Sequence, residues 1–531
     1  MEGEILIYDT TLRDGTQGEH ISFSAEEKLR IAQRLAELGV HYIEGGWPGS
    51  NPKDMRFFQM AKDLRLGATR LTAFGSTRKA HIAPEYDPNL TALLKARVDT
   101  ITLFGKSWDL QVIDILGISL EENLWMIEDS IRYLKSKGKE VMFDAEHFFD
   151  GYKANPAYGL KTIGAAVSGG ADSIVLCDTN GGSLVGEVTK TIEEVRRSFP
   201  GVPFGIHTHN DGGLAVANTL AAIEAGASMA QGTINGYGER CGNADLTSVI
   251  PNLLLKMGKK CLDDSKLPLL TEVSRYVSDI ANIPPLNERP FVGRSAFAHK
   301  GGVHVSAIAK KPSAYEHIKP ELVGNKRRVL VSDLSGKSNI DYKAQEMGIS
   351  LGGNGYGSRE IVKEIKRMED LGYQFDAAEG SLELLMKKTT GQFKEPFSLL
   401  SLKVINEKDG YGQTISQATI KISVGEEEEI TAAEGNGPVN AIDNALRKAL
   451  RKFYPSIDEM RLFDFKVRVL EGSAGTAAKV RVLIESRDGK EIWNTVGVSE
   501  NIIEASWQAL VDSIYFKLSK NLVERHTGDG R

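Results

Sequence analysis

Short apolar runs alternate with amphipathic helical stretches through the first half of the chain. Eight such runs can be distinguished: Ile5–Asp9, His41–Gly46, Arg70–Gly75, Asp99–Phe104, Glu140–Glu146, Asp172–Asp178, Phe204–His209 and Ser228–Asn235. Alternation of strand and helix is typical of parallel βα units. Eight units is the number that closes a barrel. The pattern therefore predicts an α/β protein with a (β/α)8 barrel.

The helix expected after the first run has clear signals at both ends. Ser24 followed by Glu27 forms a capping box, and Gly39 supplies the stop. An apolar stripe connects them, made of Leu29, Ala32, Leu35 and Leu38. The spacing predicts an amphipathic helix that covers the barrel.

Polar or ionisable residues follow each apolar run on its C-terminal side. In a barrel the βα loops meet there and form the active site. A doubly wound open sheet is the alternative, but it would bind its ligand at a single switch point. Polar residues at nearly every strand end therefore favour the barrel.

The periodicity changes twice beyond the barrel. Residues 266–390 show helical segments broken by Gly-rich turns, and period-2 stretches appear after Gly391. We expect a catalytic barrel in residues 1–265, helical linker subdomains in 266–390 and a C-terminal α+β domain in 391–531. This last domain would serve regulation or dimerisation.

The C-terminal domain contains an internal repeat. ATIKISV and the helical segment VNAIDNALRKAL are matched, roughly 60 residues later, by AKVRVLIE and ENIIEASWQAL. Two copies of a strand-rich unit with a helix suggest a pseudo-twofold domain. Either a ligand binds at its seam or the domain only pairs subunits, and the repeat leaves both open.

The strongest chemical signal is the pair His207 and His209. Alternate residues of a strand face the same side, so both imidazoles can bind one metal ion. Asp14 follows the first strand, and in a closed barrel the ends of the first and seventh strands share one mouth. Such a set suits Mg²⁺, Mn²⁺, Zn²⁺ or Fe²⁺. A pair of structural histidines is the alternative, which Asp14 makes weaker.

Other polar residues lie at the same mouth. Arg13, next to Asp14, could stabilise an enolate or oxyanion, or could be a structural ion-pair partner. Glu44 could anchor that arginine or be a solvated loop residue. Glu146 could act as a general base or orient a water. Asn243, in the Gly-rich run after the eighth strand, offers a neutral oxygen ligand.

Composition excludes several classes of partner. The net charge is −6, with 41% hydrophobic and 26% charged residues. This is typical of a globular protein and provides no basic surface for nucleic acid or an anionic membrane. The three cysteines favour a reducing compartment. With no signal peptide or membrane span apparent, we expect a cytoplasmic protein.

Two long motifs carry a resemblance. DTTLRDGTQ and HTHNDGGLAVANTLAAIEAGASMAQGTINGYGERCGNADL strongly resemble the signatures of the 2-isopropylmalate, homocitrate and citramalate synthase family. HKGGVH and the repeated C-terminal domain extend the likeness over essentially the whole chain. The resemblance implies that Asp14, His207 and His209 hold a divalent ion (Mg²⁺, Mn²⁺ or Zn²⁺), with Asn243 in or near its coordination shell.

The resemblance also implies the reaction. Acetyl-CoA is the co-substrate of a Claisen condensation with a 2-oxo acid, followed by thioester hydrolysis. Arg13 would stabilise negative charge, Thr179 would hydrogen-bond the substrate carboxylate and Glu146 would lie near the acetyl group. His299 and Tyr315 resemble catalytic residues that reach the active site of the neighbouring subunit, which implies a homodimer.

Within the family, three segments are most similar to the citramalate branch: ITLFGKSWDLQV, FDAEHFFDGYKANP and YEHIKPELVGNKRRVLVSDLSGKSN. In the isopropylmalate branch the fifth strand usually ends in a Ser-Pro-Glu-Asp-like motif, where this chain has residues 144–147, DAEH. Pyruvate is therefore the expected acceptor, in a pocket shaped by Phe104, Phe74 and Leu103. The product would feed isoleucine biosynthesis, and isoleucine is the expected effector of the C-terminal domain.

Three other functions remain to be weighed. The first is the isopropylmalate reaction, with 2-oxoisovalerate as acceptor and a role in leucine biosynthesis. The second is carbon–carbon cleavage by a barrel acyl-CoA lyase, which the long C-terminal domain disfavours. The third is a catalytically inert regulator, which the retention of Arg13, Asp14, His207 and His209 makes the weakest.

Overall fold

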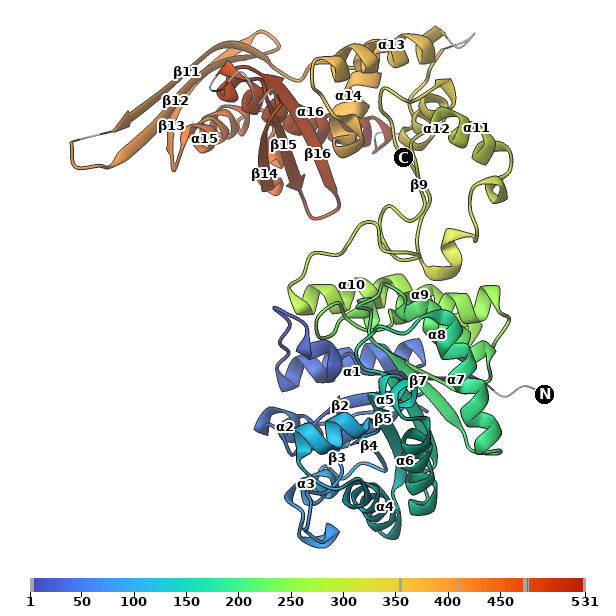
Figure 1. Ribbon diagram of the computed structural model, residues 1–531. Coiled ribbons are helices and arrows are strands. Elements are labelled where there is room, and N and C mark those ends of the chain that lie inside the picture. Colours follow the sequence, from blue (N-terminus) through green and yellow to red (C-terminus); the bar gives the residue numbers. More distant parts are fainter. Residues whose placement is uncertain (1–3, 353–355, 409, 471–474, 476, 529–531) are drawn as a thin grey trace. The chain divides into compact units, whose positions relative to one another are not determined.

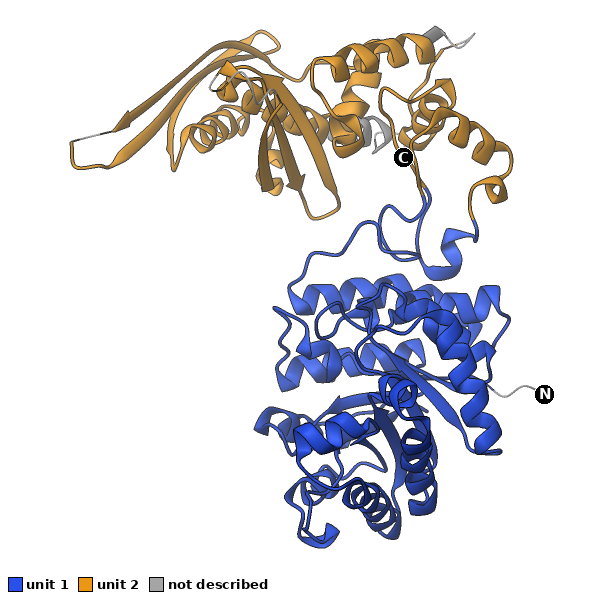
Figure 2. Ribbon diagram, viewed as in Figure 1, with its two compact units in different colours: residues 1–297, 317–327 blue, residues 298–316, 328–531 orange. Residues whose placement is uncertain are grey.

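The computed structural model describes residues 4–352, 356–408, 410–470, 475 and 477–528 (Figure 1). The chain divides into two compact units, Met1–Phe297 with His317–Arg327, and Ala298–Glu316 with Arg328–Arg531 (Figure 2). The chain thus passes between the units three times before residue 328. The domain boundaries at 265/266 and 390/391 stay a prediction.

The first unit is a closed barrel of eight parallel strands, in the order β1 to β8, with β8 paired to β1. The strands are β1 (Leu6–Asp9), β2 (Tyr42–Gly46), β3 (Arg70–Ser76), β4 (Thr100–Lys106), β5 (Glu140–Glu146), β6 (Ser173–Asp178), β7 (Phe204–Thr208) and β8 (Met229–Gly232). Each corresponds to one of the apolar runs in the sequence. The predicted (β/α)8 barrel is confirmed.

Two strands end earlier than their apolar runs. His209 follows β7 and forms an isolated bridge with Asn243. The run through Asn235 leaves the sheet after Gly232 and then turns at Ile234–Gly236, where Asn235 adopts a left-handed backbone with φ of 64°. A left-handed residue cannot continue a strand. Both departures bring the loop after β8 to the mouth beside His209.

Helices pack around the outside of the barrel (Figure 1). They are α1 (Ala25–Leu38), α2 (Pro52–Met60), α3 (Pro88–Lys95), α4 (Leu120–Ser136), α5 (Phe148–Ala154), α6 (Pro156–Gly169), α7 (Val185–Ser198), α8 (Ala215–Glu224), α9 (Leu246–Pro251) and α10 (Leu270–Ala281). The capping box of α1 is confirmed: Ser24 Oγ accepts from Glu27 N, and the Glu27 carboxylate accepts from Ser24 N. Among the described residues, no helix is both long and apolar enough to cross a membrane.

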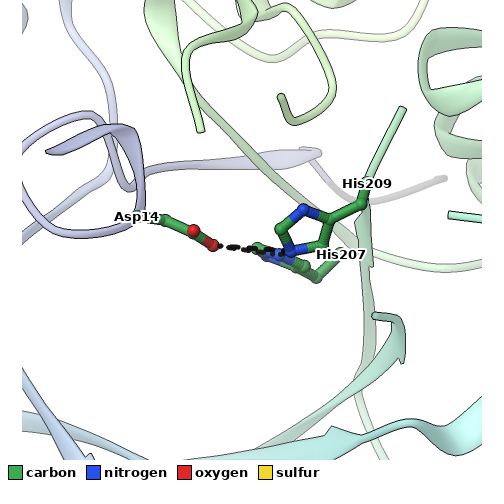
Figure 3. A group of neighbouring side chains, drawn as sticks. All are labelled: Asp14, His207 and His209. Atoms are coloured by element: carbon green, nitrogen blue, oxygen red, sulfur yellow. Dashed lines mark hydrogen bonds and ion pairs between the residues drawn. The ribbon is translucent and has the colours of Figure 1, made fainter. Parts of the chain in front are cut away.

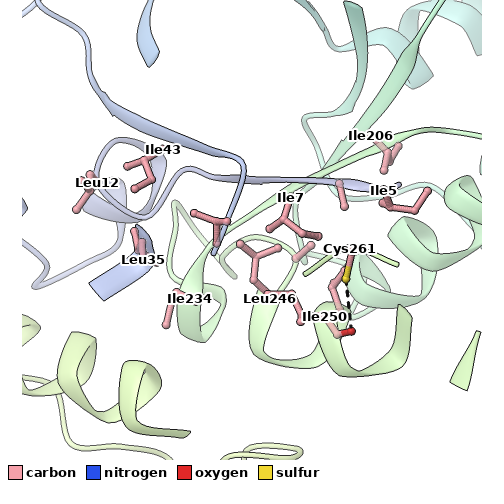
Figure 4. Close-up of a cluster of buried hydrophobic side chains, with 14 of the residues drawn as sticks. Ile5, Ile7, Leu12, Leu35, Ile43, Ile206, Ile234, Leu246, Ile250 and Cys261 are labelled. Carbon is pink, nitrogen blue, oxygen red and sulfur yellow. Dashed lines mark hydrogen bonds between the residues drawn. The ribbon is translucent and has the colours of Figure 1, made fainter. Parts of the chain in front are cut away.

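The main core lies between the strands and these helices. Ile7, Ile43 and Ile206 point from the strands into it, where Leu35 of α1 also packs (Figure 4). Leu103 belongs to this core and is fully buried. Because neighbouring residues of a strand face opposite sides, Leu103 lies outside the barrel when Phe104 faces its mouth. The expectation that Leu103 shapes the acceptor pocket is therefore wrong.

The second unit begins with helices and ends with two sheets. Its helical part contains α11 (Gly302–Lys310), α12 (Lys337–Met347), α13 (Tyr356–Asp370) and α14 (Glu379–Thr389), with the short strands β9 (Ala298–His299) and β10 (Arg328–Val329). The sheets are β11 (Ser398–Lys408), β12 (Thr414–Val424) and β13 (Glu427–Gly435), then β14 (Arg461–Val469), β15 (Val480–Arg487) and β16 (Ile492–Ser499).

The internal repeat is visible in these sheets. Each antiparallel three-stranded sheet is followed by a helix, α15 (Pro438–Leu450) after the first and α16 (Ile502–Gly528) after the second. Apolar residues of both copies share one core, among them Ile420 and Ile442 from the first and Ile484 and Trp507 from the second. The repeat therefore forms one α+β domain, as predicted.

Candidate metal and substrate site

A cavity of about 200 Å³ lies at the C-terminal ends of the barrel strands. Much of its lining was predicted from the sequence: Arg13, Asp14, Phe74, Phe104, Glu146, Thr179, His207 and His209. The barrel thus gathers at one mouth residues that are nearly 200 positions apart in sequence. This is the arrangement expected of a barrel active site.

Asp14, His207 and His209 form a buried cluster beside this cavity (Figure 3). Asp14 Oδ2 lies 3.3 Å from His207 Nε2 and 3.8 Å from His209 Nε2. The two Nε2 atoms are 3.4 Å apart. Three potential ligand atoms therefore converge, one from the turn after β1 and two from the end of β7.

A hydrogen-bonded chain orients His207. Its Nδ1 lies 3.0 Å from Gln231 Oε1 on β8, and Gln231 Nε2 donates to Asp144 Oδ1 at 3.2 Å. Asp144 accepts from the amide nitrogen of Gln231, so the amide oxygen of Gln231 faces the imidazole. His207 Nδ1 is therefore the donor to that oxygen. Nε2 therefore points toward Asp14 and His209. Groups that hold a histidine by its second nitrogen in this way strengthen metal binding.

The hydrogen bonds that link Asp144, Gln231 and His207 give a testable expectation for metal affinity. Replacing Gln231 with Leu removes the acceptor for His207 Nδ1, so we expect Mn²⁺ to bind about 10- to 100-fold more weakly. Titration of the purified protein with Mn²⁺, followed by electron paramagnetic resonance, measures this. Gln417→Leu, on the exposed surface of β12, is the control and should bind as the wild type does. Equal affinity in all three proteins would exclude this role for Gln231.

The pKa shifts in the cluster keep Asp14 ionised and His209 neutral, which are the forms that bind a metal ion. Burial would raise the pKa of Asp14, but the charge of Arg13 and the hydrogen bond from His207 hold it well below its usual range. Burial and the neighbouring His207 lower the pKa of His209 to about 4. Burial also lowers the pKa of His207, but its hydrogen bond with Asp14 outweighs this and the pKa is raised. A metal ion would compete with the proton that His207 and Asp14 share.

The donor set fits a divalent ion. Asp14 Oδ1, His209 Nδ1 and both amide atoms of Asn243 are buried without a hydrogen-bond partner among the described residues. The backbone bridge between His209 and Asn243 brings that amide close to the cluster. Two imidazoles and a carboxylate, with a further amide nearby, match the ligands of Mg²⁺, Mn²⁺ or Zn²⁺. A ligand role for Asn243 stays a prediction.

Arg13 is fixed by a buried carboxylate. Its Nε donates to Glu44 Oε1 at 2.5 Å, and its Nη1 lies 3.4 Å from Asp14 Oδ2. Glu44 is fully buried and also accepts from the hydroxyls of Tyr8 and Thr10. Glu44 is therefore an anchor for Arg13 and not a solvated loop residue. The guanidinium lies at the cavity as a pre-oriented positive charge.

Thr179 and Glu146 occupy other parts of the wall. Thr179 Oγ1 accepts from His147 N at 2.8 Å, and its backbone oxygen accepts from Arg240 Nη2 at 2.7 Å. The hydroxyl hydrogen of Thr179 can then be donated to a ligand. Glu146 Oε2 lies 2.5 Å from Lys106 Nζ, so an ion pair fixes this carboxylate at the mouth.

His299 and Tyr315 belong to the second unit, whereas every residue that lines the cavity belongs to the first. His299 Nε2 lies 3.3 Å from Glu316 Oε1. The half-exposed Tyr315 ring stacks on His304, with 4.2 Å between ring centroids. Their predicted roles at the active site of a neighbouring subunit stay predictions.

Some residues of the site were not predicted from the sequence. Trp47 lines the cavity beside Phe74 and Phe104, while Asp144 and Gln231 orient His207. Trp47 directly follows the second apolar run, so its position at a strand end was a usable signal. Gln231 gave a weaker one, as a polar residue inside an apolar run. Its partner could be found only from the register of neighbouring strands.

Comparison with family models covers most of the chain. Residues 4–277 match the model described as HMGL-like. Residues 291–373 match the homocitrate synthase post-HMGL domain-like model, and residues 376–518 match the LeuA allosteric (dimerisation) domain. The order of these three matches follows the barrel, the helical region and the two three-stranded sheets.

Curated relatives match over nearly their full length. An (R)-citramalate synthase of Geobacter sulfurreducens is 56% identical over 97% of this chain and 98% of its own. One from Aquifex aeolicus is 53% identical over 98% and 99%. A 2-isopropylmalate synthase of Methanocaldococcus jannaschii is 33% identical over 97% and 95%. The chain therefore belongs to the 2-isopropylmalate, homocitrate and citramalate synthase family, within its (R)-citramalate synthase branch.

Proposed function

We propose that this protein condenses the acetyl group of acetyl-CoA with pyruvate and hydrolyses the thioester, giving (R)-citramalate and CoA. The observation that carries the proposal is the convergence of Asp14, His207 and His209 at the barrel mouth, next to a fixed Arg13. The high identity to named (R)-citramalate synthases supports the choice of acceptor. By the same analogy, the product would feed isoleucine biosynthesis.

Asp14, His207 and His209 would hold the divalent ion, with Asn243 as a further oxygen ligand. When bound, the ion would act as a Lewis acid toward the carbonyl of the 2-oxo acid. The protein supplies the remaining interactions. Thr179 would donate its hydroxyl hydrogen to the substrate carboxylate. Arg13 would stabilise the negative charge that develops on oxygen as the new carbon–carbon bond forms.

The acetyl methyl must lose a proton before it can attack the ketone. Glu146 lies at the mouth, paired with Lys106, and would contact the acetyl group or orient the water that cleaves the thioester. His299 and Tyr315 would come from the partner subunit of a homodimer, and one of them would assist the deprotonation. This assignment rests on the family resemblance.

A panel of acceptors tests the function. Purified protein with Mn²⁺ and acetyl-CoA is incubated with pyruvate, 2-oxobutanoate or 2-oxoisovalerate, and free CoA is measured with a thiol reagent. We expect pyruvate to give the highest kcat/KM. A preference for 2-oxoisovalerate would assign the protein to the leucine pathway, and no turnover of any acid would contradict the proposal.

The C-terminal domain carries the regulatory part of the proposal. We expect isoleucine to bind there and inhibit, because the matched family model is described as allosteric and the two copies of the repeat share one core. Calorimetric titration of the full chain with isoleucine, leucine and valine measures this. Heat with isoleucine alone is the expected result. No heat with any of the three amino acids would contradict the proposed effector.

A further inference from the structure

We propose that Trp47 sets the upper size of the 2-oxo acid side chain and thereby restricts the acceptor to the smallest 2-oxo acids. This inference rests on the proposed function and gives the apolar wall of the same cavity a role in selecting the acceptor. The polar groups that would bind the carbonyl and carboxylate lie together, on Asp14, His207, His209 and Thr179. The alkyl group of the acid must then face the apolar part of the lining.

Three aromatic rings form most of that apolar wall. Phe74 and Phe104 are stacked, with 5.2 Å between their ring centroids. Trp47 meets both edge-on, at 6.0 Å from Phe74 and 5.3 Å from Phe104. The Arg13 guanidinium covers Phe74, with its Cζ 3.8 Å from the ring centroid. The positive charge that would face the reacting oxygen therefore lies directly against the apolar wall.

Trp47 is held at both ends. Its backbone N donates to Asp54 Oδ2 at 2.9 Å, and its indole Nε1 donates to Asn89 Oδ1 at 2.7 Å. Asn89 in turn donates through Nδ2 to the backbone oxygen of Ser76 at 2.6 Å. Asp54 is paired with the buried ammonium of Lys28, which also donates to Gly45 O at 3.0 Å. The indole cannot swing away without losing a hydrogen bond.

Two glycines permit this arrangement. Gly46 has φ of 146°, and a Cβ there would lie 2.5 Å from Asp54 Oδ2. A Cβ at Gly75 would lie 3.0 Å from Asn89 Oδ1. Only residues without a side chain leave room for the two groups that hold Trp47. The end of β2, α2 and the start of α3 are thus built around the position of this ring.

A wall fixed in this way discriminates by size. The cavity of about 200 Å³ must hold the 2-oxo acid and the acetyl end of the thioester. Each added methylene of the acceptor must displace part of the ring stack. In a hydrophobic pocket, one methylene changes kcat/KM by about 10- to 200-fold. Pyruvate, whose side chain is a methyl group, fits without displacement.

The test is the ratio of kcat/KM for 2-oxoisovalerate to that for pyruvate in the full-length enzyme with Mn²⁺. In Trp47→Leu we expect this ratio to rise at least about tenfold. Trp125→Leu, at an exposed position of α4, is the matched control and should leave the ratio unchanged. An unchanged ratio in a folded Trp47→Leu enzyme that still turns over pyruvate would overturn the inference.

Asn89→Ala tests the positioning role independently. This change keeps the indole but removes the acceptor of its Nε1, so the ring can move and the ratio should rise in the same direction by a smaller factor. A purely structural role would lower kcat for both acids equally and leave the ratio unchanged. If Trp47→Leu does not fold, Trp47→Phe and Asn89→Ala decide the matter by the same ratio. Failure of the wild type to turn over pyruvate would contradict the proposed function itself. The ratio of the two kcat/KM values tests only the role of Trp47.

Discussion

Replacing Asp14 with Asn lowers turnover of pyruvate and acetyl-CoA by about 10³-fold or more, while the barrel stays folded. The carboxylate supplies the only negative charge in the described His-and-carboxylate cluster, so the neutral amide would bind a divalent ion far more weakly. Losing several kcal/mol of Lewis-acid stabilisation corresponds to a rate loss of this size. Steady-state kinetics over a range of Mn²⁺ concentrations measure the effect.

Asp63→Asn is the matched control, since Asp63 is exposed on the outer surface of the barrel unit. It should retain the activity, Mn²⁺ affinity and melting temperature of the wild type. Asp14→Asn should also stay folded without metal, because Asp14 lies at the barrel mouth and not among the packed apolar side chains. Full turnover by Asp14→Asn at ordinary Mn²⁺ concentrations would exclude this residue as a ligand.

Replacing Arg13 with Gln lowers kcat by about 10²- to 10³-fold, the usual effect of removing one donor from a developing oxyanion. It also leaves the buried Glu44 without its cationic partner, which costs about 3 to 5 kcal/mol of stability. The two effects can be separated. The double variant Arg13→Gln/Glu44→Gln should regain stability but not activity.

Arg13→Lys keeps the positive charge and should retain more activity than Arg13→Gln. Mn²⁺ affinity should change little in Arg13→Lys, since Arg13 contributes no ligand atom and the positive charge beside Asp14 is kept. Steady-state kinetics, thermal melting and Mn²⁺ titration together make the comparison. If the double variant recovered activity along with stability, Arg13 would have only a structural role.

The sequence predicted the barrel because its signals are local. A buried parallel strand requires an apolar run, and the helix between two strands requires its own stripe and caps, as in α1 between Ser24 and Gly39. The pairing of Asp14 with His207 and His209 followed from barrel closure, which places the first and seventh strand ends at one mouth. The repeat of the C-terminal domain was likewise readable, since each copy has its own strands and helix.

Features that depend on register and side-chain packing were beyond the sequence. The link from Asp144 through Gln231 to His207 joins three strands, and no spacing along the chain indicates it. Leu103 and Phe104 are equally apolar, and only the phase of β4 decides that the first lies in the core and the second at the cavity. The two side chains that hold Trp47, those of Asp54 and Asn89, could not be predicted for the same reason.

The most direct test of the central claim is a crystal structure of the protein grown with Mn²⁺ and pyruvate, with anomalous diffraction recorded to locate the metal. We expect one strong anomalous peak within coordination distance of Asp14 Oδ2, His207 Nε2 and His209 Nε2, with the keto and carboxylate oxygens of pyruvate on its open side. A peak elsewhere, or these three side chains turned away from an empty mouth, would contradict the account.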